Sequence, residues 1–164
     1  MSSVLPPRLR RLCLLHGMTM PQYVIPLPAG TEVAYEVAPP EGYGWVVTAF
    51  SLSARKPDGT TISPYDFVND VGVKAKFTYR NRIDPLGLLP RERVSQWFYL
   101  GPEILDKALA YPRVVTDRLE GRAVNTMTDD VYLSIISYRY ELPLPTLFEG
   151  LEYPSEVIQE ILRR

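Results

Sequence analysis

The sequence has only one cysteine, Cys13, and one histidine, His16, among its 164 residues. A single cysteine excludes an internal disulfide framework and a zinc site built from cysteine ligands. A single histidine excludes a histidine cluster around a metal. A Ser-His pair would need His16, which lies in a basic segment among leucines, where a surface or interface histidine is favoured. We expect no cofactor, no metal and no enzymatic activity.

Long apolar runs and a strong net charge are also missing. No segment approaches the ~18 apolar residues that cross a bilayer, so no membrane partner is expected. The apolar run Leu12–Leu15 is well short of the ~7–15 residues of a signal-peptide core, so secretion is not expected. A net charge of −1 argues against coating nucleic acid, and we expect no specific nucleic-acid partner.

Residues 121–142 show the strongest local pattern, that of a β-hairpin. Val131, Leu133 and Ile135 alternate with polar or exposed positions, and a polar turn over 126–130 precedes them. From Ile136 onward the bulky residues change phase. The change indicates either a bulge at Ile135/Ile136 or a strand covered on both faces. This hairpin needs partner strands from earlier in the chain.

Six further segments show strand patterns, and turn residues separate them. They span residues 23–27, 31–37, 44–54, 71–79, 94–100 and 113–116, with a short return strand over 60–62. Lys56-Pro57-Asp58-Gly59 has the composition of a tight turn. The segment 103–110 is predicted as a helix, with a Glu103–Lys107 pair at favourable spacing. About eight strands indicate an all-β fold, a β-sandwich that is most simply a jelly roll.

The two ends of the chain differ in charge from the predicted sandwich, which spans residues 21–142. Residues 1–20 form a basic arm with Arg8, Arg10 and Arg11 and no acidic residue. Residues 143–164 form a C-terminal arm that ends in a short amphipathic helix. Its apolar stripe is Val157, Ile158, Ile161 and Leu162. Residues 1–20 carry a charge of +3, and residues 141–164, with five glutamates and two arginines, carry −3. Opposite charges on the two arms favour a subunit that binds copies of itself, so these seven residues are the predicted partner interface.

Three other groups allow a chemical role beside a structural one. Asp129-Asp130 offers two carboxylates that can bind calcium, as acids do in some lectin-like sandwiches, although a turn role is preferred. Trp45 and Trp97 form either a sugar-binding surface or part of the core and interfaces. The arginines of residues 80–93 can meet phosphate, but Asp84 and Glu92 interrupt them and favour a solvated or protein-facing loop.

A set of late segments resembles small virion proteins of tailed bacteriophages. The resemblance lies in Pro112–Val115, Asn125-Thr126 and Val131–Tyr138, and upstream in Val24–Gly30 and Gly44–Ala54. It covers residues 21–142 and neither arm. It implies a jelly-roll component of the head, neck or tail, without an active site.

We therefore expect a non-enzymatic structural protein of a phage particle, located in the virion after assembly in the host cytoplasm. A head decoration or accessory protein is the first expectation, and a neck, portal or tail component is an alternative. The expected partners are copies of the chain, with a trimer favoured, and the major capsid protein or other virion proteins. A carbohydrate-binding β-sandwich module is the alternative from another class; it would expose Trp45 or Trp97. A hydrolase would need a polar cleft.

Overall fold

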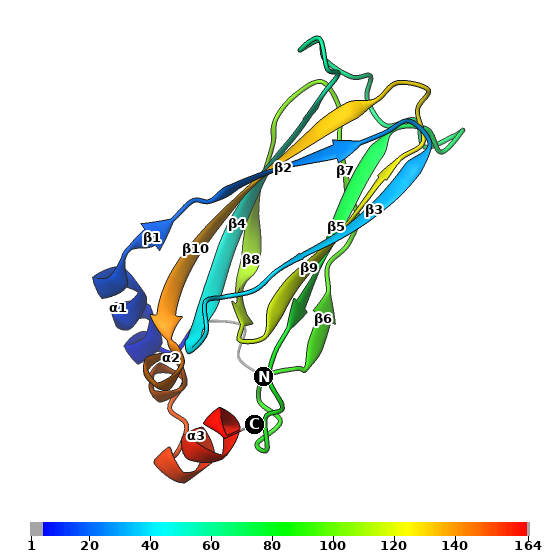
Figure 1. The fold of residues 1–164 in the computed structure, drawn as a ribbon. Coiled ribbons are helices and arrows are strands. Elements are labelled where there is room, and N and C mark those ends of the chain that lie inside the picture. Colours follow the sequence, from blue (N-terminus) through cyan, green and yellow to red (C-terminus); the bar gives the residue numbers. More distant parts are fainter. Residues whose placement is uncertain (1–4, 164) are drawn as a thin grey trace.

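The computed structural model describes residues 5–163 as a β-sandwich with three helices gathered at one end (Figure 1). Sheet A contains β1 (Met18–Thr19), β2 (Gln22–Leu27), β4 (Tyr43–Arg55), β8 (Leu105–Val115) and β10 (Val131–Pro143). Sheet B contains β3 (Thr31–Val37), β5 (Val73–Arg80), β6 (Glu92–Val94), β7 (Phe98–Tyr99) and β9 (Arg118–Asn125). All pairings are antiparallel.

The strand order is that of a jelly roll, as the sequence predicts. In sheet A the order is β2-β10-β4-β8, and β1 also pairs with β10, on the same edge as β2. In sheet B the order is β3-β9-β5, and β6 and β7 both pair with the far side of β5. From β2 onward most changes of strand are also changes of sheet, and the last strand, β10, lies between β2 and β4. Side chains that point inward from both sheets form the main core, in which Phe50 and Phe77 stack with ring centroids 4.0 Å apart.

The predicted hairpin is present as β9 and β10, but the irregularity lies elsewhere than expected. Burial alternates without interruption from Val131 through Ile135 to Arg139, so there is no bulge at Ile135/Ile136. The register shifts between Tyr138 and Arg139, opposite the unpaired Thr48 of β4. The second alternative, a strand covered on both faces, agrees with the burial, because bulky residues of β10 belong to two different apolar clusters. The inner set belongs to the main core, and Tyr140 packs under the helices.

The prediction of a helix over residues 103–110 is wrong. Residues 105–115 form strand β8, which pairs with β4 from Leu52 to Trp45. Leu105 and Leu109 pack against the main core, four residues apart as a helix would also place them. Local spacing therefore did not distinguish the two structures, and pairing with the long neighbour β4 decided in favour of a strand.

Two other expected strands are interrupted. The turn at Lys56–Gly59 forms, with Gly59 at φ +86°, but only Thr61 then bridges back to Arg55 before the chain leaves. Ile62 is buried in the core, so this segment crosses toward sheet B instead of continuing a hairpin. The predicted strand over 94–100 is not continuous. Val94 ends β6, residues 95–97 form no strand, and β7 contains only Phe98 and Tyr99. The Ser95 hydroxyl there accepts the Phe77 backbone N–H.

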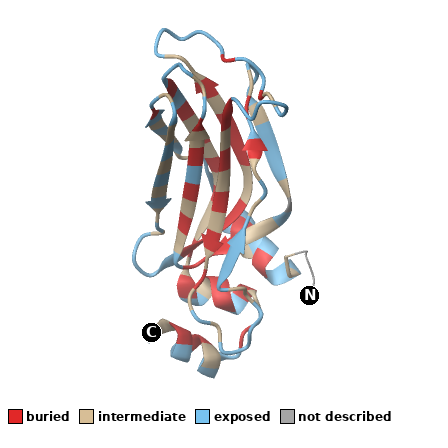
Figure 2. Ribbon diagram, turned by 90° about the vertical axis from the view of Figure 1, so that its right-hand side faces the viewer, coloured by how far each residue is buried: buried red, intermediate tan, exposed pale blue. Residues whose placement is uncertain are grey.

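Both predicted arms fold onto the sandwich. Helices α1 (Pro7–His16), α2 (Leu144–Gly150) and α3 (Ser155–Leu162) cover the end of sheet A near Val46 and Val114. They enclose a second apolar cluster, visible as buried bands in the helices of Figure 2. Gly150 allows α2 to approach Leu9 of α1 closely, because a Cβ there would meet the Leu9 backbone. No helix among residues 5–163 is long and apolar enough to span a bilayer.

Candidate functional site

The basic residues predicted to face a partner occupy α1. Arg8 forms an ion pair with Glu149 of α2, so part of the charge complementarity between the two ends is satisfied within one chain. Arg10 and Arg11 are exposed on the same helix. The structure therefore leaves these two arginines, and not Arg8, available as free charges.

The aliphatic residues predicted to face a partner lie in α3 and mainly serve the chain itself. Ile158 and Ile161 are buried in the second apolar cluster, and Val157 and Leu162 pack against that cluster. The stripe on α3 thus docks on α2 and the end of the sandwich. The physical reason is proximity, since only a short turn separates α2 from α3.

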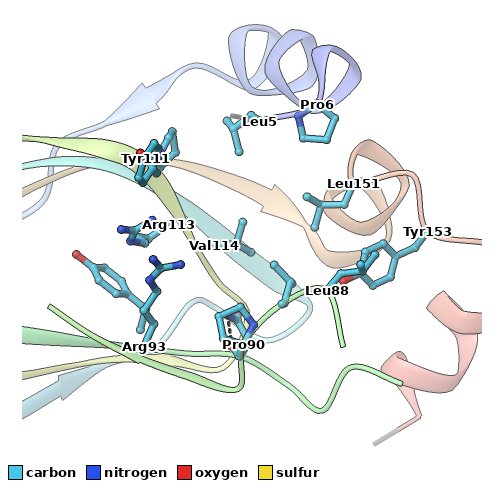
Figure 3. Close-up of a pocket in the computed structure, with 14 residues that line it drawn as sticks. Leu5, Pro6, Leu88, Pro90, Arg93, Tyr111, Arg113, Val114, Leu151 and Tyr153 are labelled. Carbon is cyan, nitrogen blue, oxygen red and sulfur yellow. Dashed lines mark hydrogen bonds between the residues drawn. The ribbon is translucent and has the colours of Figure 1, made fainter. Parts of the chain in front are cut away.

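A cavity of about 540 Å³ opens at the helical end of the sandwich, between β8 and the loop that joins β5 to β6. Figure 3 shows Arg93 and Arg113 side by side at one end of this pocket, with apolar side chains along the rest of it. The lining residues are Leu5, Pro6, Tyr79, Asn81, Leu88, Leu89, Pro90, Arg93, Tyr111, Pro112, Arg113, Val114, Leu151 and Tyr153. We call this cavity the end pocket.

The end pocket combines positive charge with an unsatisfied hydroxyl. Among the described residues, no carboxylate lies within ion-pairing distance of Arg93 or Arg113. Burial and the neighbouring Arg93 lower the pKa of Arg113. The buried Tyr79 hydroxyl has no hydrogen-bond partner within the described part of the chain. Burial raises the pKa of Tyr79, which opposes ionisation, although the two arginines act in the opposite direction. The pocket can thus accept an anion at neutral pH.

The loop wall of the end pocket is held by two polar anchors. Asn81 is buried; its amide donates to the Pro90 carbonyl, and its Oδ1 accepts from the N–H and hydroxyl of Thr116. The Asp84 carboxylate accepts the Tyr153 hydroxyl at 2.6 Å and the N–H groups of Leu88 and Leu89. The loop is therefore tied both to the sheet and to the segment after α2.

We expect Asp84→Asn to destabilise the protein by about 1–2 kcal/mol at pH 7, because hydrogen bonds to a charged acceptor are lost. Burial would raise the pKa of Asp84, but the bonds from Tyr153 and the loop N–H groups outweigh burial and lower it. A lowered pKa in the folded state gives stability that is present above the ordinary pKa of about 3.9 and is lost as pH falls through the folded value. Urea unfolding between pH 7 and pH 3 measures both effects.

The matched control for that measurement is Asp106→Asn, because Asp106 is an exposed acid of β8. It should leave the free energy of unfolding within about 0.5 kcal/mol of the wild-type value. An Asp84→Asn protein with wild-type stability at pH 7 would show that the anchor is dispensable.

Large apolar side chains are exposed along residues 14–24, from the end of α1 through β1 into β2. They are Leu14, Leu15, Met18, Met20 and Val24. We call this set the edge stripe, because β1 and β2 pair only with β10 and so form one edge of sheet A. An apolar sheet edge with free backbone groups is a surface on which another chain can pair. These apolar residues are visible in the sequence, but the sequence does not say which of them are exposed. The exposure of Leu14 and Leu15 depends on which face of α1 packs on the sandwich.

Neither tryptophan presents an open ring. Trp45 is buried, and the guanidinium of Arg139 lies 3.4 Å from its ring centroid. Trp97 is half-buried on the outer face of sheet B, with the amino groups of Lys74 and Lys76 4.6 Å and 4.7 Å from its ring centroid. The cations over both rings therefore argue against a sugar-binding surface built on tryptophan.

The outer face of sheet B has a shallow groove of about 490 Å³. Its lining residues are Ala34, Tyr35, Glu36, Lys76, Thr78, Glu120, Gly121 and Arg122. Cross-strand ion pairs surround it, including Arg80 with Glu120 at 2.7 Å. The groove is thus lined by charged side chains from three strands of sheet B.

The other residues considered for chemistry have structural surroundings. Asp130 accepts the Ala29 N–H at 2.8 Å, and Asp129 lies 3.4 Å from the Lys56 amine, in line with the turn role. Within residues 5–163, no three His, Cys, Asp or Glu side chains lie together as metal ligands. His16 is exposed at the end of α1. Cys13 is buried against the second cluster, and burial raises the pKa of its thiol to about 11.

Comparison with known proteins gives structural similarity only. No protein family and no curated protein matches this sequence. A mitogen from Yersinia pseudotuberculosis has a TM-score of 0.39 at 10% identity, over 73% of this chain and 84% of that one. TmCBM61, solved with β-1,4-galactotriose, has a TM-score of 0.36 at 14% identity, over 77% of this chain and 88% of that one. These TM-scores are too low to assign a relative or a ligand, and the fold rests on the strand pairing described above.

Proposed function

We propose that this protein is a non-enzymatic structural subunit that assembles with copies of itself through the edge stripe. One observation carries the proposal: five large apolar side chains are exposed within the eleven residues 14–24. Exposed apolar patches of this kind are typical of protein–protein contact sites.

The position of the edge stripe favours a second protein chain as its partner. Gln22 and Val24 of β2 point away from the core, and β2 has no strand on its outer side among the described residues. A second copy can add backbone hydrogen bonds at this edge and cover Val24 and Met20 at the same time. Arg10 and Arg11 lie one helical turn before the stripe and supply a charged rim.

The proposed place of this subunit is a phage particle, as a head decoration or accessory protein, with a neck, portal or tail position as the alternative. The support is the sequence resemblance over residues 21–142, together with the jelly-roll strand order that the resemblance implies. Electron microscopy of purified particles labelled for this chain tests the location. Particles that lack the chain would remove the virion role and leave self-assembly as a separate question.

We expect a Met20→Lys, Val24→Lys double variant to weaken self-association at least about tenfold, because buried charge would replace apolar contact. Sedimentation equilibrium on wild type and variant measures the effect. Val68→Lys is the matched control: Val68 is 93% exposed in the loop before β5, away from the stripe, and should assemble as wild type does. A wild-type chain that stays monomeric at roughly 100 μM contradicts the proposal, because even a weak dimer with a dissociation free energy of about 5.5 kcal/mol would be half-formed near that concentration.

Carbohydrate binding is the second candidate, and the groove on sheet B is the observation that favours it. Thr78, Glu120 and Arg122 offer both donors and acceptors there, which is what sugar hydroxyls require. Titration of isotope-labelled protein with oligosaccharides, followed by NMR, tests this candidate. Shifts confined to β3, β5 and β9 would support it, and the absence of shifts with millimolar sugar would remove it.

A further inference from the structure

We propose that the end pocket binds an organic anion with an apolar body, whose oxyanion is held by Arg93 and Arg113. This site is independent of the edge stripe and of any self-assembly. Three features of the pocket carry the inference: two unpaired guanidinium groups, a buried hydroxyl without a partner, and a long apolar wall.

Neither arginine has a carboxylate partner among the described residues, although the Arg113 guanidinium lies 5.6 Å from the centroid of the Tyr111 ring. They come from different sheets, Arg93 from β6 and Arg113 from β8, and they lie side by side although their charges repel (Figure 3). The acids nearest to Arg93 in sequence are engaged elsewhere: Glu92 pairs with Arg80, and Asp84 accepts from Tyr153. A bound oxyanion would remove this repulsion and can accept from both guanidinium groups.

Arg113 occupies an inward position in its strand. It pairs with Val47, which belongs to the main core, while its neighbour Val114 belongs to the second cluster. An arginine at an inward position is costly unless it is paired. The position therefore indicates a ligand-binding residue better than a solvated surface charge.

Tyr79 provides the second, independent observation. Its side chain is 2% exposed, it lines the pocket, and its hydroxyl is unsatisfied among the described residues. Buried hydroxyl groups in proteins are nearly always hydrogen-bonded. A ligand oxygen beside the two arginines would satisfy it.

The remaining walls select an apolar body. Leu88, Leu89 and Pro90 come from the β5–β6 loop, and Val114 and Leu151 close the opposite side. A volume of about 540 Å³ is within the ordinary range of small-molecule sites, about 300–1,000 Å³. The pocket is therefore larger than an inorganic ion needs. An aliphatic carboxylate and an alkyl phosphate share the required chemistry.

Isothermal titration calorimetry of the full chain with decanoate, decyl phosphate and decanol, all below their aggregation limits, tests the site. We expect at least one of the two anions to bind about tenfold or more tightly than neutral decanol, and acetate to bind more weakly than decanoate. A preference for decanoate indicates a carboxylate ligand, and a preference for decyl phosphate indicates a phosphate ester. Decanol that binds as tightly as both anions overturns the proposal, as does the absence of binding by both anions at 1 mM.

Variants locate the binding. Arg93→Gln and Arg113→Gln should each weaken anion binding at least about tenfold, since each removes a charge-assisted contact. Arg91→Gln is the matched control, because Arg91 is an exposed arginine of the same loop that does not line the pocket. Tyr79→Phe removes only the unpaired hydroxyl, so it should weaken anion binding without lowering the melting temperature. If each of the single variants Arg93→Gln and Arg113→Gln binds the anion as tightly as the wild type, the assignment of these arginines as the anion-binding residues is overturned.

Discussion

Leu9→Ala is expected to destabilise the protein by about 2–5 kcal/mol, the usual cost of truncating a fully buried leucine. Leu9 is completely buried in the second apolar cluster, between α2 and the end of sheet A. The residual cavity would lie where Gly150 brings the two helices together, and a close backbone contact leaves little room to collapse. Urea unfolding at pH 7 measures the loss.

The same helix offers a matched control in Leu15→Ala. Leu15 is 82% exposed, so its truncation should change stability by less than about 0.5 kcal/mol. The pair separates two descriptions of the N-terminal segment. A free basic arm, as expected from the sequence, predicts small effects for both variants. A helix packed on its own sandwich predicts a large effect for Leu9 alone.

Asn125→Ala is expected to cost about 3 kcal/mol, because it leaves several buried backbone groups without partners. Asn125 is completely buried at the end of β9 in sheet B. Its amide donates to the carbonyl of Leu27 in sheet A at 3.0 Å and to that of Asp129 in the β9–β10 turn at 2.8 Å. Its Oδ1 accepts the Met127 N–H at 2.9 Å. One side chain thus joins the two sheets and shapes the hairpin turn.

Two further variants make that measurement specific. Asn69→Ala removes an exposed asparagine and should stay within about 0.5 kcal/mol of wild type. Asn125→Asp keeps the shape and the acceptor but turns a carboxylate oxygen toward carbonyl oxygens, so it should be at least as destabilising as Asn125→Ala. Wild-type stability of Asn125→Asp would refute the role of the amide donor.

The strands of this protein were largely predictable because their side chains alternate. In β5, the inward positions Val73, Ala75, Phe77 and Tyr79 are the apolar ones, and the burial confirms that alternation. Strand number and turn spacing indicated a β-sandwich, and the jelly roll was the preferred order among sandwiches. Segment 103–110 failed because its leucines four residues apart fit a helix as well as a strand, and the pairing of β8 with β4 lies outside any local window.

The candidate site was only partly accessible from the sequence. Arg93 was visible as one of several loop arginines, but nothing local connected it to Arg113, twenty positions later. The two meet because β6 and β8 belong to different sheets but lie at the same edge of the sandwich. The one available signal was an arginine at an inward strand position between Pro112 and Val114.

The sequence by itself determined the fold class, because alternating side chains and turn residues act over a few neighbours. It also ruled out cysteine-based zinc sites and histidine clusters, since the residues are lacking. Only the tertiary structure decided where the two ends lie. The same leucines and isoleucines can pack on a partner or on their own sandwich. The choice depends on the apolar patch at Val46 and Val114, which forms only after β4 and β8 have paired and which the helices then cover.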